Sequence, residues 1–217
     1  MKSPHTTATL ALLPILFSGT TQAATVFTSG SEEANNTVLT AGVTMGYAIT
    51  PTTNLQLNAL GFWDAGSDGL PAAFQLGLWQ SSTETLLASV TIDSTDALDA
   101  SLTVEGGQWR YETLLSPITL TSGSTYTLGF FNPVEMSFSD YLFFNSFTIT
   151  SDPAVSLSLE RYAINTGSLS FPSFPFVSID AYPGQVNAQF TVIPEPSATT
   201  LAALGTLALL KRRRRSI

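Results

Sequence analysis

The feature that most constrains this chain is a two-residue alternation of apolar and other side chains between residues 25 and 192. In the stretch GVTMGYAIT, Val43, Met45, Tyr47 and Ile49 fall on one face of an extended chain. Five further stretches alternate similarly: SVTID, QWRYETLL, STYTLGFF, VSLSLERYAI and VNAQFTV. A period of two is typical of β-strands, and this region lacks the 3.6-residue pattern of an amphipathic helix. The sequence therefore predicts a β-structured core.

Two stretches, Leu57–Trp63 and Tyr141–Phe147, are apolar on both faces, which predicts central strands that are covered on both sides. Clusters of Gly, Pro, Asn, Asp and Ser separate the strands at short intervals. Short strands with this spacing predict an all-β fold, an antiparallel β-sandwich of jelly-roll type over residues 25–192. We expect Phe171–Tyr182 to form an irregular loop that covers one edge.

Charge is distributed very unevenly along the chain. Between residues 25 and 193 there are two arginines and fifteen acidic residues, so this region has a net charge of −13. Such a surface repels phosphate backbones, which excludes nucleic-acid binding and leaves neutral or cationic partners. The chain contains no cysteine, which excludes a disulfide scaffold and cysteine-ligated metals.

Residues 1–24 have the three parts of a secretory signal peptide. Lys2 provides a short positive region, and an apolar run extends from Ala8 to Phe17. Small residues follow in TQAA, which predicts cleavage by signal peptidase after Ala23 or Ala24. A short buried helix is the alternative, but Pro14 and the change to a strand pattern after Ala24 argue against it.

The other end, residues 193–217, has an apolar run from Ser197 to Leu210. A helix of this run would be about 21 Å long, shorter than the roughly 30 Å hydrocarbon core of a bilayer. Five basic residues follow it and predict a stop-transfer signal in the cytoplasm: Lys211, Arg212, Arg213, Arg214 and Arg215. The sequence thus predicts an exported domain held transiently in the inner membrane by a single C-terminal helix.

Pro194, Glu195 and Pro196 directly precede this apolar run. The order of exported domain, Pro-Glu-Pro, short apolar helix and terminal arginines closely resembles the PEP-CTERM sorting signal of Gram-negative bacteria. The resemblance covers VIPEPSATTLAALGTLALLKRRRRSI. It implies that an exosortase, an integral-membrane transpeptidase-like cysteine enzyme, recognises the three residues and processes the tail. It implies no activity for the domain itself.

A second resemblance covers Ile49 to about Phe131. A hydrophobic strand ends in LGFWD, an acidic glycine turn follows, and the next strand ends near Leu78–Trp79. LLASVTI and a later LTSGSTY hairpin complete the pattern. These motifs resemble an uncharacterised family of exported bacterial β-sandwich domains, for which no activity is implied.

Most catalytic chemistry is excluded by residue usage. The single histidine, His5, lies in the predicted signal peptide, so the exported domain has no histidine base or ligand. A glycosidase-like carboxylate pair remains, with Glu112 and Glu160 as candidates. The alternative is that both are solvent-facing strand residues, paired with neighbouring Arg110 or Arg161. We therefore predict that the protein is not an enzyme and has no cofactor.

Two binding sites can be considered. In WDAGSDGL, Asp64 and Asp68 with nearby glycines have the character of a calcium loop, although a plain turn explains the same residues. Trp63, Trp79 and Trp109 could form a sugar-stacking platform, with core packing as the alternative.

Three functions follow from these patterns. We expect a non-catalytic structural or interaction domain at the cell surface or in an extracellular polysaccharide matrix. A carbohydrate-binding module acting on exopolysaccharide is the second hypothesis, and a glycoside-active enzyme is the third.

Overall fold

The computed structural model describes residues 23–29, 39–104, 106–137, 142–145, 150–164, 166–175 and 181–194. Regular structure in these ranges is β except for one 3₁₀ turn, η1 (Ala65–Ser67), so the prediction of an all-β antiparallel fold is confirmed. Across these ranges no helix has the length and apolar character needed to cross a membrane. The predicted signal peptide, up to residue 22, and the predicted sorting helix lie outside the described residues.

In chain order, the strands are β1 (Ala24–Thr25), β2 (Phe27–Ser29), β3 (Val43–Pro51), β4 (Leu55–Asp64), β5 (Phe74–Gln80), β6 (Thr85–Ile92), β7 (Ala97–Val104), β8 (Gly107–Leu120), β9 (Tyr126–Asn132), β10 (Phe143–Asn145), β11 (Thr150–Ser151), β12 (Val155–Ile164), β13 (Phe174–Pro175), β14 (Ala181–Pro183) and β15 (Val186–Val192).

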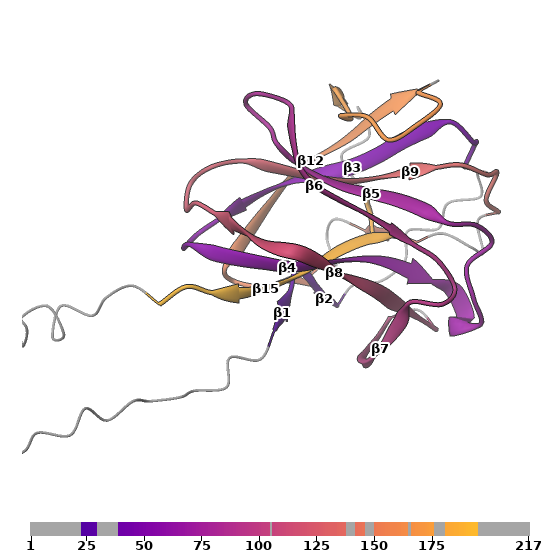
Figure 1. The fold of residues 1–217 in the computed structure, drawn as a ribbon, viewed down its shortest axis with the longest axis horizontal. Helices are drawn as coiled ribbons and strands as arrows, with labels where there is room; N and C mark the ends of the chain where they lie inside the picture. The colour runs from indigo at the N-terminus through magenta and orange to yellow at the C-terminus, as the bar shows by residue number, and fades with distance from the viewer. Residues whose placement is uncertain are drawn as a thin grey trace, which may run out of the picture.

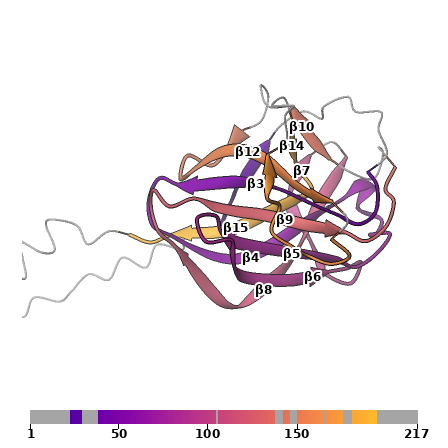
Figure 2. The same cartoon turned by 90° about the horizontal axis from the view of Figure 1, so that it is seen from above.

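Two main sheets form two layers (Figures 1 and 2). One sheet has five strands in the order β1-β15-β4-β8-β7, and the other has six in the order β13-β12-β3-β9-β5-β6. Pairs β10–β14 and β2–β11 form two small additional sheets. The chain changes layer between β3 and β4, between β4 and β5, between β6 and β7, and between β8 and β9, whereas β5–β6 and β7–β8 are paired within one sheet.

The core lies between the two main sheets. The four residues predicted to share one face of β3 are all buried in it, which confirms that prediction. Phe62 of β4 stacks on Phe74 of β5, with ring centroids 4.1 Å apart, and meets Phe130 of β9 edge-on at 5.2 Å. The Tyr47 hydroxyl donates a hydrogen bond to the carbonyl of Val186 at 3.0 Å, and burial raises the pKa of Tyr47 well above its ordinary value. Tyr47 therefore stays neutral and links the two sheets.

The outer face of the six-stranded sheet is also covered. Gly46, Gly129 and Gly77 are register partners on β3, β9 and β5, and together they form a shallow trough. The ring of Trp79 lies over this trough, since a Cβ on Gly77 would be 2.6 Å from its Cη2 atom and one on Gly129 would be 3.3 Å from its Cζ3 atom. Phe171 packs edge-on against the same indole at 6.1 Å. Glycine is required here because a side chain would displace the ring.

Three segments differ from the sequence predictions. Tyr141–Phe147 was expected to be a central strand, but its described part, β10, pairs only with β14 in a two-stranded sheet. Leu142, directly before β10, is buried in the core, so an apolar run can be buried without belonging to a main sheet. The sequence analysis also missed β7, an edge strand in which Leu98, Ala100, Leu102 and Val104 alternate but only Val104 is buried. Phe171–Tyr182 was expected to be an irregular loop over one edge, but it contains the short strand β13, which pairs with β12 and forms the edge of the six-stranded sheet.

We predict that Gly77→Ala lowers the free energy of unfolding by about 1–3 kcal/mol, because the added methyl group overlaps the ring of Trp79. Urea denaturation followed by tryptophan fluorescence measures this. Ser89→Ala, an exposed position paired with Gly77, is the matched control and should change stability little. Combining Gly77→Ala with Trp79→Leu should cost less than the two single changes added together. Equal stability of Gly77→Ala and the unchanged protein would contradict this packing.

Candidate functional site

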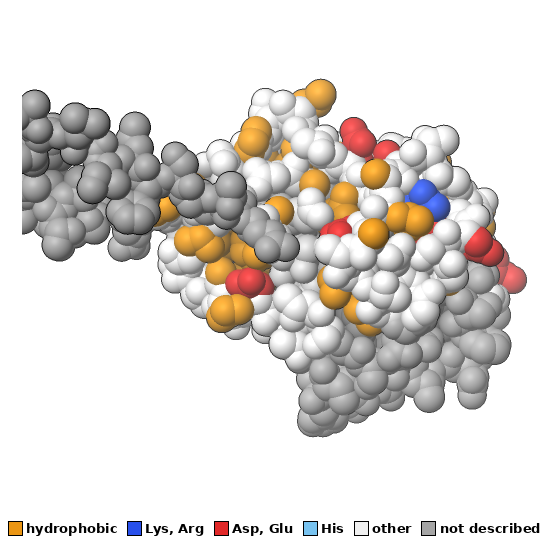
Figure 3. Space-filling view, turned by 90° about the horizontal axis from the view of Figure 1, so that it is seen from below, with side chains coloured by type: hydrophobic (Ala, Val, Ile, Leu, Met, Phe, Trp, Pro, Cys, Tyr) orange, Lys and Arg blue, Asp and Glu red, His pale blue; other side chains and the backbone are white. Residues whose placement is uncertain are grey.

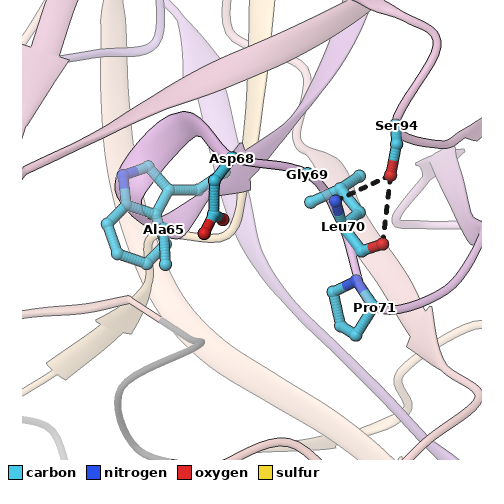
Figure 4. Close-up of a pocket in the computed structure, with 7 residues that line it drawn as sticks. Ala65, Asp68, Gly69, Leu70, Pro71 and Ser94 are labelled. Atoms are coloured by element: carbon cyan, nitrogen blue, oxygen red, sulfur yellow. Dashed lines mark hydrogen bonds between the residues drawn. The ribbon is translucent and has the colours of Figure 1, made fainter.

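A hollow beside the sequence-predicted loop residues, here called the loop pocket, has a volume of about 400 Å³. It lies between the β4–β5 connection and the turn that joins β6 to β7 (Figure 4). Trp63, Asp68, Leu70, Pro71 and Ser94 contribute to its lining. One side is therefore formed by the WDAGSDGL stretch in which a calcium loop was considered.

Ser94 fastens the two sides of the loop pocket together (Figure 4). Its hydroxyl accepts a hydrogen bond from the Leu70 backbone N–H at 2.9 Å and donates one to the Leu70 carbonyl at 3.1 Å. Donor and acceptor are thus both engaged by the same residue. Ser94 therefore holds the two loops together.

Beneath the pocket lies a buried ion pair between Asp64 and Arg110. Arg110 Nε donates to Asp64 Oδ2 at 2.7 Å, and Asp64 has no exposed surface. Arg110 Nη1 also donates to the Asp96 carbonyl at 2.6 Å, while the Asp64 carboxylate accepts the Gly69 N–H at 3.2 Å. The pair therefore ties both loops that form the pocket to the adjacent strands β4 and β8.

The local sequence supports this tight loop. Gly66, Ser67 and Gly69 have φ values of +67°, +57° and +125°, in the region that favours glycine. Two of the three positions are glycine, and the Asp64 carboxylate accepts a backbone hydrogen bond inside the loop. The loop thus has the geometry of the plain-turn alternative.

The calcium prediction concerns the same loop. Both oxygens of Asp64 face Gly69 or Arg110, so an ion there would have to compete with a guanidinium group. Asp68 is exposed and lines the pocket. Within the described ranges, no group of three or more His, Cys, Asp or Glu side chains could hold a metal ion. These contacts favour a structural role for Asp64.

The turn between β6 and β7, on the other side of the loop pocket, is held by the side chain of Asp93. Asp93 Oδ1 accepts hydrogen bonds from the Thr95 hydroxyl at 2.6 Å and from the Thr95 N–H at 2.7 Å. These two bonds lower the pKa of Asp93, with a smaller contribution from Arg110. Asp93 is therefore ionised at neutral pH and holds the turn that carries Ser94.

All three candidate stacking tryptophans are buried: Trp63, Trp79 and Trp109 are 4%, 3% and 0% exposed. The Trp63 indole N–H donates to the Val104 carbonyl at 3.2 Å, and that of Trp109 donates to the Gly184 carbonyl at 3.0 Å. Trp79 occupies the glycine trough on the opposite sheet. Their burial favours the core-packing alternative over a shared stacking platform.

The candidate carboxylate pair is divided between the two sheets. Glu112 is an exposed residue of β8 in the five-stranded sheet, whereas the backbone of Glu160 belongs to β12 in the six-stranded sheet. Arg110, considered as a partner for Glu112, is instead paired with Asp64. The side chain of Glu160 lies outside the described part of the structure.

Two more hollows lie elsewhere on the domain. The outer-sheet hollow, of about 390 Å³, is lined by Gln75, Leu86, Ser89, Val90, Thr91, Ser168 and Leu169. The edge hollow, of about 210 Å³, is lined by Ala23, Ala24, Thr25, Thr28, Asp99, Ser101, Leu102 and Asp152. The first therefore has an uncharged lining, whereas two carboxylates line the second.

Comparison with known proteins adds a family. A model described as "Domain of unknown function (DUF4082)" matches residues 26–177, most of the chain. The chain belongs to this family. The DUF4082 match ends before β15, yet β15 lies between β1 and β4, so the folded unit continues to the end of that strand. The search of curated proteins gave no match.

The sequence analysis missed the Asp64–Arg110 pair. Phe62 and Arg110 are register partners on β4 and β8, so the two charges are brought together by strand pairing across 46 residues. One signal was available: each is a charged residue beside bulky apolar ones, in GFWDA and QWRYE. A charge in such a setting needs a partner.

We predict that Arg110→Met destabilises the domain by about 3–5 kcal/mol, because it leaves the Asp64 carboxylate buried without its cation. Asp68→Asn, an exposed acid in the same loop, is the control and should change stability by less than about 0.5 kcal/mol. Asp64→Leu combined with Arg110→Met should recover part of the loss, since no charge is then left unpaired. Urea midpoints measure all three variants. A stability loss below about 1 kcal/mol for Arg110→Met would contradict the assigned role.

Proposed function

We propose that this DUF4082 domain is an exported, non-catalytic structural or interaction module, delivered to the cell surface or extracellular matrix through a PEP-CTERM-type signal that an exosortase processes. The observation that carries the proposal is the position of Pro194. The Ile193 N–H still donates to the Asn54 carbonyl at 2.9 Å, and Pro194 is exposed immediately after it. The Pro-Glu-Pro sequence thus begins two residues after β15, the last strand that the structure describes.

The position of the predicted signal-peptide cleavage site also agrees with export of the domain. Ala24 and Phe190 are register partners of β1 and β15, so the predicted signal-peptide cleavage site and the sorting sequence flank one edge of the five-stranded sheet. Glu195, Pro196 and the tail with Lys211–Arg215 lie outside the described residues. Their roles in recognition and stop-transfer belong to the proposal through the sequence resemblance.

The finer fold assignment is part of the same proposal. We assign the two facing sheets to the jelly-roll-like sandwich class. Repeated changes of layer along the chain and the entirely antiparallel pairing support this assignment. In the loop pocket, the Ser94 hydroxyl is hydrogen-bonded to the Leu70 backbone, and Asp68 supplies a single carboxylate to the described lining. These two features support the non-catalytic role.

A carbohydrate-binding role is the second candidate, and the outer-sheet hollow favours it. Its lining combines hydroxyl and amide groups with leucine and valine and carries no charge. Neutral sugars present hydroxyl groups and apolar ring faces, so this lining matches their chemistry. Ser89 contributes a small, exposed side chain to this lining, beside the position where Trp79 covers Gly77.

We predict that mass spectrometry of envelope and extracellular fractions finds chains that lack residues 1–23 and end close to Pro194–Pro196. Deleting the exosortase gene should shift the protein to forms that retain Lys211–Arg215. Changing Pro194 and Pro196 to Ala should have the same effect, because the recognition sequence is lost. A matched pair of changes at Thr199 and Thr200 to Ala should leave processing unchanged. Recovery of chains ending only at Ile217 in both strains would leave a simple membrane anchor as the better account.

For the second candidate, we predict that Ser89→Arg abolishes retention of the domain on a neutral exopolysaccharide, because the new side chain fills the outer-sheet hollow. Affinity electrophoresis in gels containing the polysaccharide measures this retention. Thr83→Arg adds the same charge at an exposed turn outside the hollow and serves as the control. Equal retention of both variants would remove this hollow as the sugar site.

A further inference from the structure

We propose that the free edge of β6 binds an extended, uncharged strand of a partner protein, and that this partner strand carries a basic residue at each end. The partner would extend the six-stranded sheet by one strand. This inference rests on the interaction role proposed above and deepens it, because it names a surface and the chemistry of the partner.

β6 is the last strand of the six-stranded sheet, and in the described residues its backbone pairs only with β5. β4 and β8 of the other sheet come near β6 but form no ladder with it. The N–H and C=O groups on the other side of β6 therefore have no strand partner. Such groups can hold an added strand through main-chain hydrogen bonds.

The other described edges carry features that hinder an added strand. β1 and β13 are each two residues long, and β13 contains Pro175. β12, which lies beside β13, contains Glu160 and Arg161, and the edge strand β7 contains Asp99. Short strands, prolines and charges keep sheet edges unpaired. β6 is long by comparison and has neither proline nor charge along Thr85–Ile92.

The side chains of β6 form two rows that an added strand would cover. Ala88 and Val90 pack against the core but are only half-buried, whereas Ser89 and Thr91 are exposed. Leu87 forms a bulge in the register with β5 and is 36% exposed. A partner strand in which Val or Ile alternates with Ser or Thr matches both rows, because β-branched side chains pack and hydroxyl groups hydrogen-bond across neighbouring strands.

An acidic residue lies at each end of this edge. Glu84 is exposed in the turn directly before β6, and Asp93 directly follows Ile92. Neither Glu84 nor Asp93 forms an ion pair within the described part of the chain. A partner strand of about eight residues with Lys or Arg at both ends would bring a cation to each acid.

The same two acids argue against a second copy of the chain as the occupant. In a two-fold antiparallel pair the start of one β6 lies opposite the end of the other, so Glu84 would face Asp93 of the second copy. Like charges directly opposite each other in paired strands are destabilising. The excess of acidic residues between residues 25 and 193 adds to this repulsion. The charge pattern therefore favours a different partner with basic ends.

The test measures binding of labelled peptides to the whole chain in a non-ionic detergent, by fluorescence anisotropy at low salt. The probe peptide has about eight residues in which Val alternates with Ser or Thr, flanked by a Lys at each end. It should bind at least about tenfold more tightly than the same peptide flanked by Glu, because its charges oppose those of the edge. The Lys-flanked peptide with a central Pro should not bind, since proline cannot donate to the ladder. Equal binding of the peptides with and without Pro would indicate charge attraction alone and overturn the strand site.

Variants of the two sheets test the position of the charges. Glu84→Lys should weaken binding of the Lys-flanked peptide and strengthen binding of the Glu-flanked peptide. Glu112→Lys makes the same change of charge at an exposed position in the five-stranded sheet, and it should leave both affinities nearly unchanged. Equal effects of the two variants would contradict the assigned edge.

Amide hydrogen exchange locates the bound peptide. Exchange within Thr85–Ile92 should slow when the Lys-flanked peptide is added, while exchange in β7 stays the same. Protection of another edge would overturn the proposal. Protection of β6 on raising the protein concentration without peptide would also overturn it and assign the edge to a second copy. Absence of peptide binding would refute this inference alone, because the export tested above by mass spectrometry does not depend on it.

Discussion

The contact of Phe62 with Phe74 and Phe130 is the interaction on which the rest of the structure depends. Phe62 belongs to the five-stranded sheet, whereas its two ring partners belong to the other, so one side chain sets the spacing of the layers. Aromatic pairs in these geometries contribute about 0.5–1.5 kcal/mol beyond the burial of their surface. Phe62 is also the register partner of Arg110, so the same residue positions the strand that carries the buried cation.

The buried Asp64–Arg110 pair and the acidic surface are the two main electrostatic features of the domain. Burying Asp64 with Arg110 costs hydration for both groups, and the backbone bonds to Gly69 and Asp96 offset part of that cost. One of the two arginines between residues 25 and 193 is therefore buried in an ion pair. On the face drawn in Figure 3, basic side chains are confined to one small area, while acidic groups occur at several places. Acidic groups distributed in this way repel other anions.

Sequence patterns predicted the strands well because alternation is a local property. The inward face of β3 is an example, as is β15, whose bounds match the stretch VNAQFTV. The outward face of β3 was unpredictable, since its cover comes from Trp79 and from Phe171, which are distant in sequence. The same limit explains the acidic loop, where the partner of Asp64 arrives on another strand. The apolar run at Tyr141–Phe147 led to a wrong placement of β10. Hydrophobicity indicates that a strand is buried, but it does not indicate which strand it pairs with.

The pairing of β1 with β15 has a consequence for modular use of this fold. Directly opposed residues of antiparallel strands have Cα atoms about 4.5–5.5 Å apart, so the first and last strands of the domain offer nearly coincident attachment points. A unit with coincident ends can be spliced into a surface loop of a host protein without stretching the host backbone. Joining copies head to tail, by contrast, requires linkers that are long enough to bring the next copy clear of the same edge. The geometry therefore favours insertion as a side branch over assembly into an extended rod.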